Sequence, residues 1–218
     1  MLSRSDVEDW LTLSFLPGLG CTLINHLVQQ LGTPGAVFQN TDQVASLPRV
    51  GTRLTALLRN EQQLAAARAR AREELARIDR LNVRLLVPLS PEYPSVLRSI
   101  ADSPVLLYCR GDLNCLQQRA IAIIGSRSAT DYGKRIATGL AAELASMGIT
   151  IVSGAAYGID AAAHCGSLAA GGATVGVLGC GLDVVYPRSH ADLFRKIAGS
   201  GLLISEYPLG TQPEGFRF

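Results

Sequence analysis

A glycine, a serine and an arginine stand directly after an apolar run in the stretch IAIIGSRSATDYGK, residues 121–134. An arginine side chain binds phosphate oxygens through paired charge-assisted hydrogen bonds, and backbone N–H groups at the start of a helix also favour anions. Gly125, Ser126 and Arg127 are therefore candidate phosphate ligands. Lys134, further along the same stretch, is a second candidate cation.

Three later segments also follow apolar runs and combine glycines with aromatic or basic side chains: GAAYGID (154–160), GCGLDVVYPR (179–188) and PLGTQPEGFRF (208–218). Their cations could neutralise phosphates, and their tyrosine rings could stack on unpaired bases. A single tyrosine is more often a packing residue, as Tyr186 before Pro187 would be. The candidate ligands in these segments are Tyr157, Gly158, Gly179, Gly181, Tyr186, Arg188 and Arg217.

Nucleotide cofactors are not expected at these segments. A dinucleotide site needs G-x-G-x-x-G after the first strand and an acidic residue about 20 positions later. Here Gly125 is followed by Ser126 and Arg127, and the next apolar run ends at Gly154 without a carboxylate. A Walker A loop is also missing, because Lys134 is followed by Arg135 and so is not part of a G-K-[ST] string.

A hydrolase with a Ser/His/Asp group is an alternative hypothesis. It would use Asp160 and His164, which lie four positions apart, and the serines at 126 and 128. The G-x-S-x-G elbow that exposes a nucleophilic serine is absent from the sequence. Asp160 is better explained as the N-cap of the helix that follows it, and His164 as a packed helix residue. The sequence therefore predicts neither catalytic residues nor an enzyme.

Four apolar, β-branched runs position these segments: residues 120–125, 149–154, 173–179 and 201–207. Helical segments separate them, a pattern typical of an α/β protein with a parallel sheet and helices on both faces. Right-handed crossovers make the four strands parallel, so all four glycine-containing segments emerge at one edge of the sheet. Ligands of open α/β sheets bind at that carboxyl edge.

Residues 1–80 read as a separate small all-α domain, with 81–218 as the sheet domain. LPGLGCTLINHL (16–27) and LPRVGTRLTALL (47–58) form an approximate repeat, in which a glycine turn precedes an apolar helix. Such helix-hairpin-helix turns can hold a DNA phosphate, but the cations near the second copy are only Arg49 and Arg53. A protein-docking role for this region is the favoured alternative.

The net charge of +2 is too small to identify a nucleic-acid binder by itself. The five cysteines form no CxxC pair, so no zinc site is expected, and an odd number of cysteines fits a reducing cytoplasm. No apolar run is long enough for a transmembrane helix, so no membrane association is expected.

The sheet region resembles the DNA processing protein A family (DprA/Smf). The resemblance rests on IAIIGSR (121–127), GITIVSGAAYGIDAAAH (148–164), VGVLGCGLDVVYPRSH (175–190) and LISEYPLG (203–210), with a weaker match of the helical region to sterile-alpha-motif-like or helix-hairpin-helix modules. It implies a Rossmann-like domain that binds single-stranded DNA, protects it during natural transformation and helps to load RecA. It also implies a homodimer formed through that domain.

Two departures from the family pattern are visible. Tyr157 stands where many members have an arginine, which favours a stacking or packing role there. The family continues with a Pro-x-Arg-Asn-Arg segment beyond GFRF, so the sheet domain is expected to be incomplete at its C-terminus. The rival reading is a lysine-decarboxylase-like nucleotide phosphoribohydrolase, whose Pro-Gly-Gly-x-Gly-Thr-x-x-Glu loop is missing; it would need Glu206 as a catalytic carboxylate.

Overall fold

The computed structural model describes residues 3–48 and 50–215, and its chain divides into two compact units. One unit comprises Met1–Arg80 and Leu86–Leu106, and the other comprises Leu81–Leu85 and Leu107–Phe218. The segment between residues 86 and 106 therefore groups with the helical residues, whereas the sequence pattern assigns it to the sheet domain. The boundary between independently folding domains remains a prediction.

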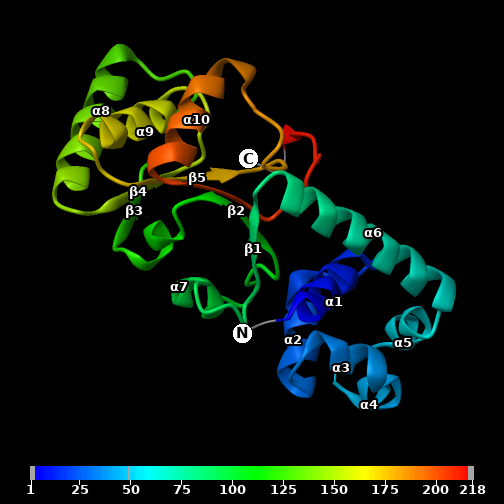
Figure 1. Ribbon diagram of the computed structural model, residues 1–218. Coiled ribbons are helices and arrows are strands. Elements are labelled where there is room, and N and C mark those ends of the chain that lie inside the picture. Colours follow the sequence, from blue (N-terminus) through cyan, green and yellow to red (C-terminus); the bar gives the residue numbers. More distant parts are fainter. Residues whose placement is uncertain (1–2, 49, 216–218) are drawn as a thin grey trace. The chain divides into compact units, whose positions relative to one another are not determined.

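The first unit is built from helices, in agreement with the sequence pattern (Figure 1). Gly20 and Gly51 are the N-caps of α2 and α5, so each predicted glycine turn does precede a helix. Arg49, a candidate cation beside the second turn, lies outside the described residues. The helices are α1 (Arg4–Phe15), α2 (Cys21–Leu31), α3 (Pro34–Gln39), α4 (Thr41–Ser46), α5 (Thr52–Leu58), α6 (Glu61–Arg80) and the short α7 (Ser95–Arg98).

Side chains from both parts of this unit form its core. Trp10 of α1 is buried, and α6 packs against α1 and buries an apolar face that includes Ala71 and Ile78. The buried Tyr93 donates a hydrogen bond to the carbonyl of Pro104 (2.7 Å), and the Asn25 side chain donates to the carbonyl of Ser103 (2.7 Å). The bond from Asn25 attaches residues 86–106 to the helices.

The second unit contains a sheet with the strand order β1-β2-β6-β5-β4-β3. The strands β3 to β6 are parallel to one another, as predicted, and β2 runs antiparallel to β6. Pro88, Pro91, Pro94 and Pro104 lie between β1 and β2, where no ladder hydrogen bond is lost. The bounds are β1 (Arg84–Leu86), β2 (Leu107–Gly111), β3 (Ala120–Ala122), β4 (Thr150–Ser153), β5 (Thr174–Leu178) and β6 (Leu202–Ser205).

All three long helices of this unit lie on one face of the sheet (Figure 1). They are α8 (Asp131–Ser146), α9 (Ile159–Ala169) and α10 (Ala191–Ser200), with α9 packed between α8 and α10. The strands β3 to β6 follow one another in a single direction, so right-handed crossovers must all pass over the same side. The expectation of helices on both faces is therefore wrong for the described residues, and Ile124 is left 75% exposed.

Gly166 allows α8 and α9 to pack closely against each other. A Cβ on Gly166 of α9 would lie 2.2 Å from the carbonyl oxygen of Thr138 on α8, so only glycine fits there. The Thr138 hydroxyl also donates a hydrogen bond to the carbonyl of Ala162 (3.3 Å). The backbones of α8 and α9 are thus in direct contact. This contact holds the N-terminal ends of both helices, and the loops that precede them, in position.

Candidate functional site

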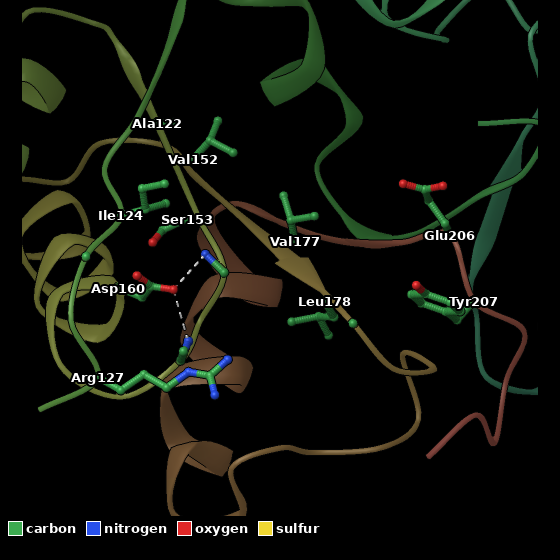
Figure 2. Close-up of a pocket in the computed structure, with 14 residues that line it drawn as sticks. Ala122, Ile124, Arg127, Val152, Ser153, Asp160, Val177, Leu178, Glu206 and Tyr207 are labelled. Carbon is green, nitrogen blue, oxygen red and sulfur yellow. Dashed lines mark hydrogen bonds between the residues drawn. The ribbon is translucent and has the colours of Figure 1, made fainter. Parts of the chain in front are cut away.

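An open groove of about 540 Å³ lies at the carboxyl ends of β3, β4, β5 and β6 (Figure 2). We call it the edge groove. It receives residues from each of the four strands or from the segment that follows it, as the parallel topology predicts. Its lining consists of Ala122, Ile124, Gly125, Arg127, Val152, Ser153, Gly154, Ala156, Asp160, Val177, Leu178, Gly179, Glu206 and Tyr207.

The edge groove combines an apolar floor with a charged rim. Strand residues such as Val152 and Val177 form the floor, because the face away from the helices is open. Figure 2 shows Arg127 and Asp160 on one side and Glu206 across from them. Among the described lining residues, Arg127 is the one basic side chain, so it is the side chain that can pair with an anion, and the carboxylates of Asp160 and Glu206 line the same groove.

Arg127 is positioned by direct contact between the first two loops. The backbone N–H of Ile159 donates a hydrogen bond to the carbonyl of Ser126 (3.2 Å). Gly158 has a φ of +79°, and a Cβ there would lie 2.1 Å from the same carbonyl oxygen. A side chain at 158 would therefore push the loop that bears Arg127 away.

Asp160 holds the second loop together instead of capping the helix. Its carboxylate accepts hydrogen bonds from the backbone N–H groups of Gly154 (3.1 Å) and Ala156 (3.4 Å). The N-cap of α9 is Gly158, and Asp160 lies in the first turn. The predicted N-cap role was therefore wrong, because the loop folds back far enough for its own N–H groups to reach this carboxylate.

Arg127 also borders a small hollow that contains both candidate tyrosines. This tyrosine hollow is lined by Arg127, Ala156, Tyr157, Tyr186 and Pro187. The Tyr157 hydroxyl is hydrogen-bonded to the hydroxyl of Ser189 (2.9 Å), and its ring meets the His190 ring at 4.9 Å between centroids. His190 in turn donates from Nδ1 to the carbonyl of Ala155 (3.0 Å), so the second and third loops are connected through Tyr157.

The glycines of the third loop have different surroundings. Gly179 is buried and lines the edge groove. Gly181 donates a hydrogen bond from its N–H to the carbonyl of Thr211 (3.0 Å), and a Cβ there would lie 2.7 Å from the carbonyl oxygen of Pro208. Gly181 thus lets the third and fourth loops pack together and does not line the edge groove.

The remaining candidate ligands are not gathered in the edge groove or the tyrosine hollow. Lys134 forms an ion pair with Asp131 (3.7 Å) on the exposed first turn of α8. Arg188 is exposed at the start of the short helix η2 (Arg188–His190). The hydroxyl of Ser126 accepts a hydrogen bond from the N–H of Ser128 (3.1 Å), and Arg217 lies outside the described residues.

His164 is a packed residue, as predicted. The Thr174 hydroxyl donates to the carbonyl of Ile151 (2.8 Å), so His164 must donate from Nδ1 to that hydroxyl (2.7 Å). Burial lowers the pKa of His164 to about 4, although the carbonyl of Ser153 would favour the charged form. His164 and Asp160 therefore have structural partners, and a Ser/His/Asp group is not assembled among the described residues.

Neither a metal centre nor a membrane span is found in the part of the chain that the structure describes. No group of three or more His, Cys, Asp or Glu side chains within residues 3–48 and 50–215 is placed to hold a metal ion. Over the same residues, none of the helices is both long and apolar enough to cross a membrane.

The sequence patterns did not single out three residues that the structure places at the site. Tyr207 lines the edge groove, and Ser189 and His190 contact Tyr157. Each follows a parallel strand at the carboxyl edge, and that position is the signal that could have found them.

The sequence model of the DNA recombination-mediator protein A family matches residues 84–218. Protein Smf from Synechocystis sp. is 42% identical over 141 residues, which are 63% of this chain and 35% of that protein. The X-ray structure of DNA processing protein A from Streptococcus pneumoniae superposes with a TM-score of 0.79 at 28% identity and covers 96% of this chain and 71% of the other.

A second structure, concerned with the single-stranded DNA binding mode of DNA processing protein A from Helicobacter pylori, has a TM-score of 0.56 at 35% identity and covers 62% of this chain and 60% of the other. This chain thus spans only about a third of the length of the Synechocystis relative. The resemblance predicted from the sequence motifs is confirmed. The chain belongs to the DNA recombination-mediator protein A family.

Proposed function

We propose that this protein binds single-stranded DNA at the carboxyl edge of its parallel sheet and acts as a recombination mediator, by binding and not by catalysis. The observation that carries this proposal is the convergence of the four loops around Arg127. Family membership supports it, as does the similarity to the Helicobacter protein, whose structure concerns a single-stranded DNA binding mode.

The chemistry of the edge suits a nucleic-acid backbone. Arg127 offers a fork of donors to a phosphate, and the start of α9 lies beside it. The described groove lacks the ring of donors that would read base edges in a duplex, so binding should depend little on sequence. Affinity is expected to fall as salt rises, because each neutralised phosphate releases counterions. Lys134, Arg188 and Arg217 would extend this contact along the strand.

The biological role follows from the family and is part of the same proposal. The protein would protect incoming single strands during natural transformation and help RecA to assemble on them in the cytoplasm. Its cysteines are all free thiols, which fits a reducing compartment. The addition of RecA to DNA that the protein already coats, followed by the rate of filament assembly, tests the loading step.

Homodimerisation through the sheet unit belongs to the proposal as well. Tyr132, Ile136 and Leu140 are exposed on α8 at a spacing of four residues, so they form one apolar stripe. A second copy of the chain is the proposed occupant of this stripe. Sedimentation analysis of Ile136→Lys against the wild type tests it: a dimer that dissociates supports the assignment, and an unchanged dimer refutes this surface.

The phosphoribohydrolase alternative keeps one observation in its favour. The edge groove has the volume of a small-molecule site and holds Arg127, Asp160 and Glu206 together. Asp160 is bonded to two backbone N–H groups, and Glu206 is the other carboxylate that lines the groove. Base release from nucleoside monophosphates that disappears in Glu206→Gln would establish this alternative.

The direct experiment is a titration of single-stranded and double-stranded oligonucleotides of equal length at several salt concentrations, followed by fluorescence anisotropy. Tighter binding of the single strand, with an affinity that declines with salt, is the expected result. Equal or absent binding of both forms would refute the proposal.

A further inference from the structure

A second open groove, of about 680 Å³, lies in the first unit. We call it the helical groove. Its lining residues all belong to Met1–Arg80 or Leu86–Leu106, so the groove is formed within a single unit. Its volume is in the range of ligand sites. The lining consists of Trp10, Thr22, Asn25, His26, Val28, Gln29, Gly32, Pro88, Leu89, Arg98, Ser99, Ile100, Ala101 and Ser103.

The helical groove presents apolar side chains on a fixed backbone. Leu89 is 49% exposed and Ile100 is 44% exposed, and both line the groove. The turn at residues 87–90 is closed by one backbone hydrogen bond and one buried side-chain hydrogen bond. The bond from Asn25 to the carbonyl of Ser103 (2.7 Å) ties the other end of the segment to α2. Such a preformed apolar surface loses little entropy when a ligand binds.

Arg98 is the one arginine or lysine among the described lining residues, and its guanidinium is held in place. Its Nε donates a hydrogen bond to the carbonyl of Pro88 (2.9 Å) and its Nη2 to the carbonyl of Ser90 (2.6 Å), and it lies 5.7 Å from the centroid of the Tyr93 ring. These partners are neutral, so they do not cancel its positive charge. The described lining contains no Asp or Glu, and Asp102 of the same segment is outside it. The groove therefore favours an anionic group.

Trp10 adds a hydrogen-bond donor that the protein leaves unpaired. It lines the groove and is 1% exposed, and its indole N–H has no hydrogen-bond partner among the residues that the structure describes. A buried donor without an acceptor raises the free energy of the folded state. An occupant that carries carbonyl oxygens can supply the acceptor, which favours a peptide over a simple anion.

The same features argue against a nucleic acid in this groove. A DNA strand carries a phosphate at every nucleotide, and its binding sites therefore supply several cations. The helical groove offers one arginine between apolar side chains. Charge complementarity and apolar surface together fit a short segment in which a single carboxylate stands next to apolar residues.

We propose that the helical groove binds a peptide segment of a partner protein, in which one acidic residue is adjacent to apolar residues. The carboxylate pairs with Arg98, the apolar side chains cover Leu89 and Ile100, and a backbone carbonyl accepts from Trp10. This site is separate from the DNA site of the proposed function and does not depend on it.

Trp10 is the one tryptophan of the chain, so its fluorescence and its indole N–H resonance both report on this groove. The probes are tripeptides with blocked ends that contain Asp, Leu and Phe in every order, each with an analogue in which Asn replaces Asp. At least one Asp tripeptide should change both signals saturably and bind roughly two- to fivefold more tightly than its Asn analogue, as an exposed ion pair would allow. The proposal is overturned if no tripeptide gives a saturable change, or if every Asp and Asn form binds equally.

Gln29 and Gln30 provide a matched pair of sites for added charge. Both are exposed on α2, but only Gln29 lines the groove. Gln29→Glu should weaken binding of the Asp tripeptide by roughly two- to fivefold and Gln29→Lys should strengthen it by a similar factor, whereas the same changes at Gln30 should leave it unchanged. Equal effects at the two positions would contradict binding in this groove.

Arg98→Gln should remove the difference between the Asp and Asn tripeptides. Because Arg98 also bonds to two carbonyls, this variant can lose stability, and the Gln29 variants then decide the outcome without removing any of those bonds. Acetate, which has the charge without the apolar body, should leave the Trp10 signals unchanged at the concentration that saturates the tripeptide site. Displacement of the tripeptide by oligo-dT would show a nucleic-acid site instead and would overturn the proposal.

Discussion

The backbone N–H of Ile159 donates a hydrogen bond to the carbonyl of Ser126 at 3.2 Å, and this bond joins the first two loops of the sheet edge. It places Arg127 next to the start of α9, beside the loop that Asp160 closes. The candidate site therefore depends on close backbone contact as much as on its charged side chains.

Gly158→Ala should break this contact. The new methyl group would stand 2.1 Å from the Ser126 carbonyl oxygen and would also occupy a φ of +79°. We expect a loss of roughly 1–3 kcal/mol in the free energy of unfolding and weaker single-strand binding. Chemical denaturation and anisotropy measure the two effects.

Gly148→Ala is the matched control, because Gly148 has nearly the same φ (+75°) but nothing within 4 Å of its added Cβ. Its free energy of unfolding should fall by only about 1 kcal/mol, because alanine is strained at a positive φ but meets no neighbouring atom. Its DNA affinity should be unchanged. Equal effects of the two substitutions on DNA binding would show that the close approach at Gly158 does not position Arg127.

Gly166→Ala should loosen the contact between α8 and α9. Its methyl group would lie 2.2 Å from the Thr138 carbonyl oxygen, and neither helix backbone can move freely. A destabilisation of about 1–3 kcal/mol is expected from overpacking. Gly139→Ala on α8 has open space around it and should stabilise the protein by about 0.5–1 kcal/mol through helix propensity. A Gly166→Ala variant that melts at or above the wild-type temperature would contradict this packing.

His164 should make stability depend on pH below neutrality. Its folded-state pKa, lowered by burial to about 4, lies below the ordinary value of 6.5, so the unfolded chain binds the extra proton between these values. The stabilisation is complete above about pH 6.5 and is lost as the pH falls toward 4, by about 3 kcal/mol in total. Urea unfolding at a series of pH values measures it. His164→Gln should flatten this part of the profile, and an unchanged slope would contradict the assignment.

Much of the fold follows from local patterns, and the rest depends on tertiary arrangement. The four β-branched runs were enough to predict parallel strands with their loops at one edge. The order β6-β5-β4-β3 is not encoded in any one segment, so the placement of all three helices on one face could not be predicted from helix and strand alternation.

The site was predictable to a similar degree. Arg127 and Gly125 were predicted as candidate ligands because their chemistry is visible in one short motif, and both line the edge groove. The roles of Asp160 and Tyr157 depend on partners that the fold brings to them: loop N–H groups for the carboxylate, and Ser189 with His190 for the ring. Such contacts join separate loops and leave no spacing signal in the sequence.

The most direct test of the central claim is the affinity for oligo-dT of Arg127→Ala compared with Arg195→Ala. Arg195 is an exposed arginine on α10 in the same unit, ion-paired with Asp192 and absent from the edge groove and the tyrosine hollow. Both variants lose one positive charge, so the global electrostatic effect is matched. Binding that weakens at least tenfold in Arg127→Ala, about 1.4 kcal/mol, and stays near wild type in Arg195→Ala is the predicted result. Equal losses in the two variants would contradict a single-stranded DNA site at the carboxyl edge.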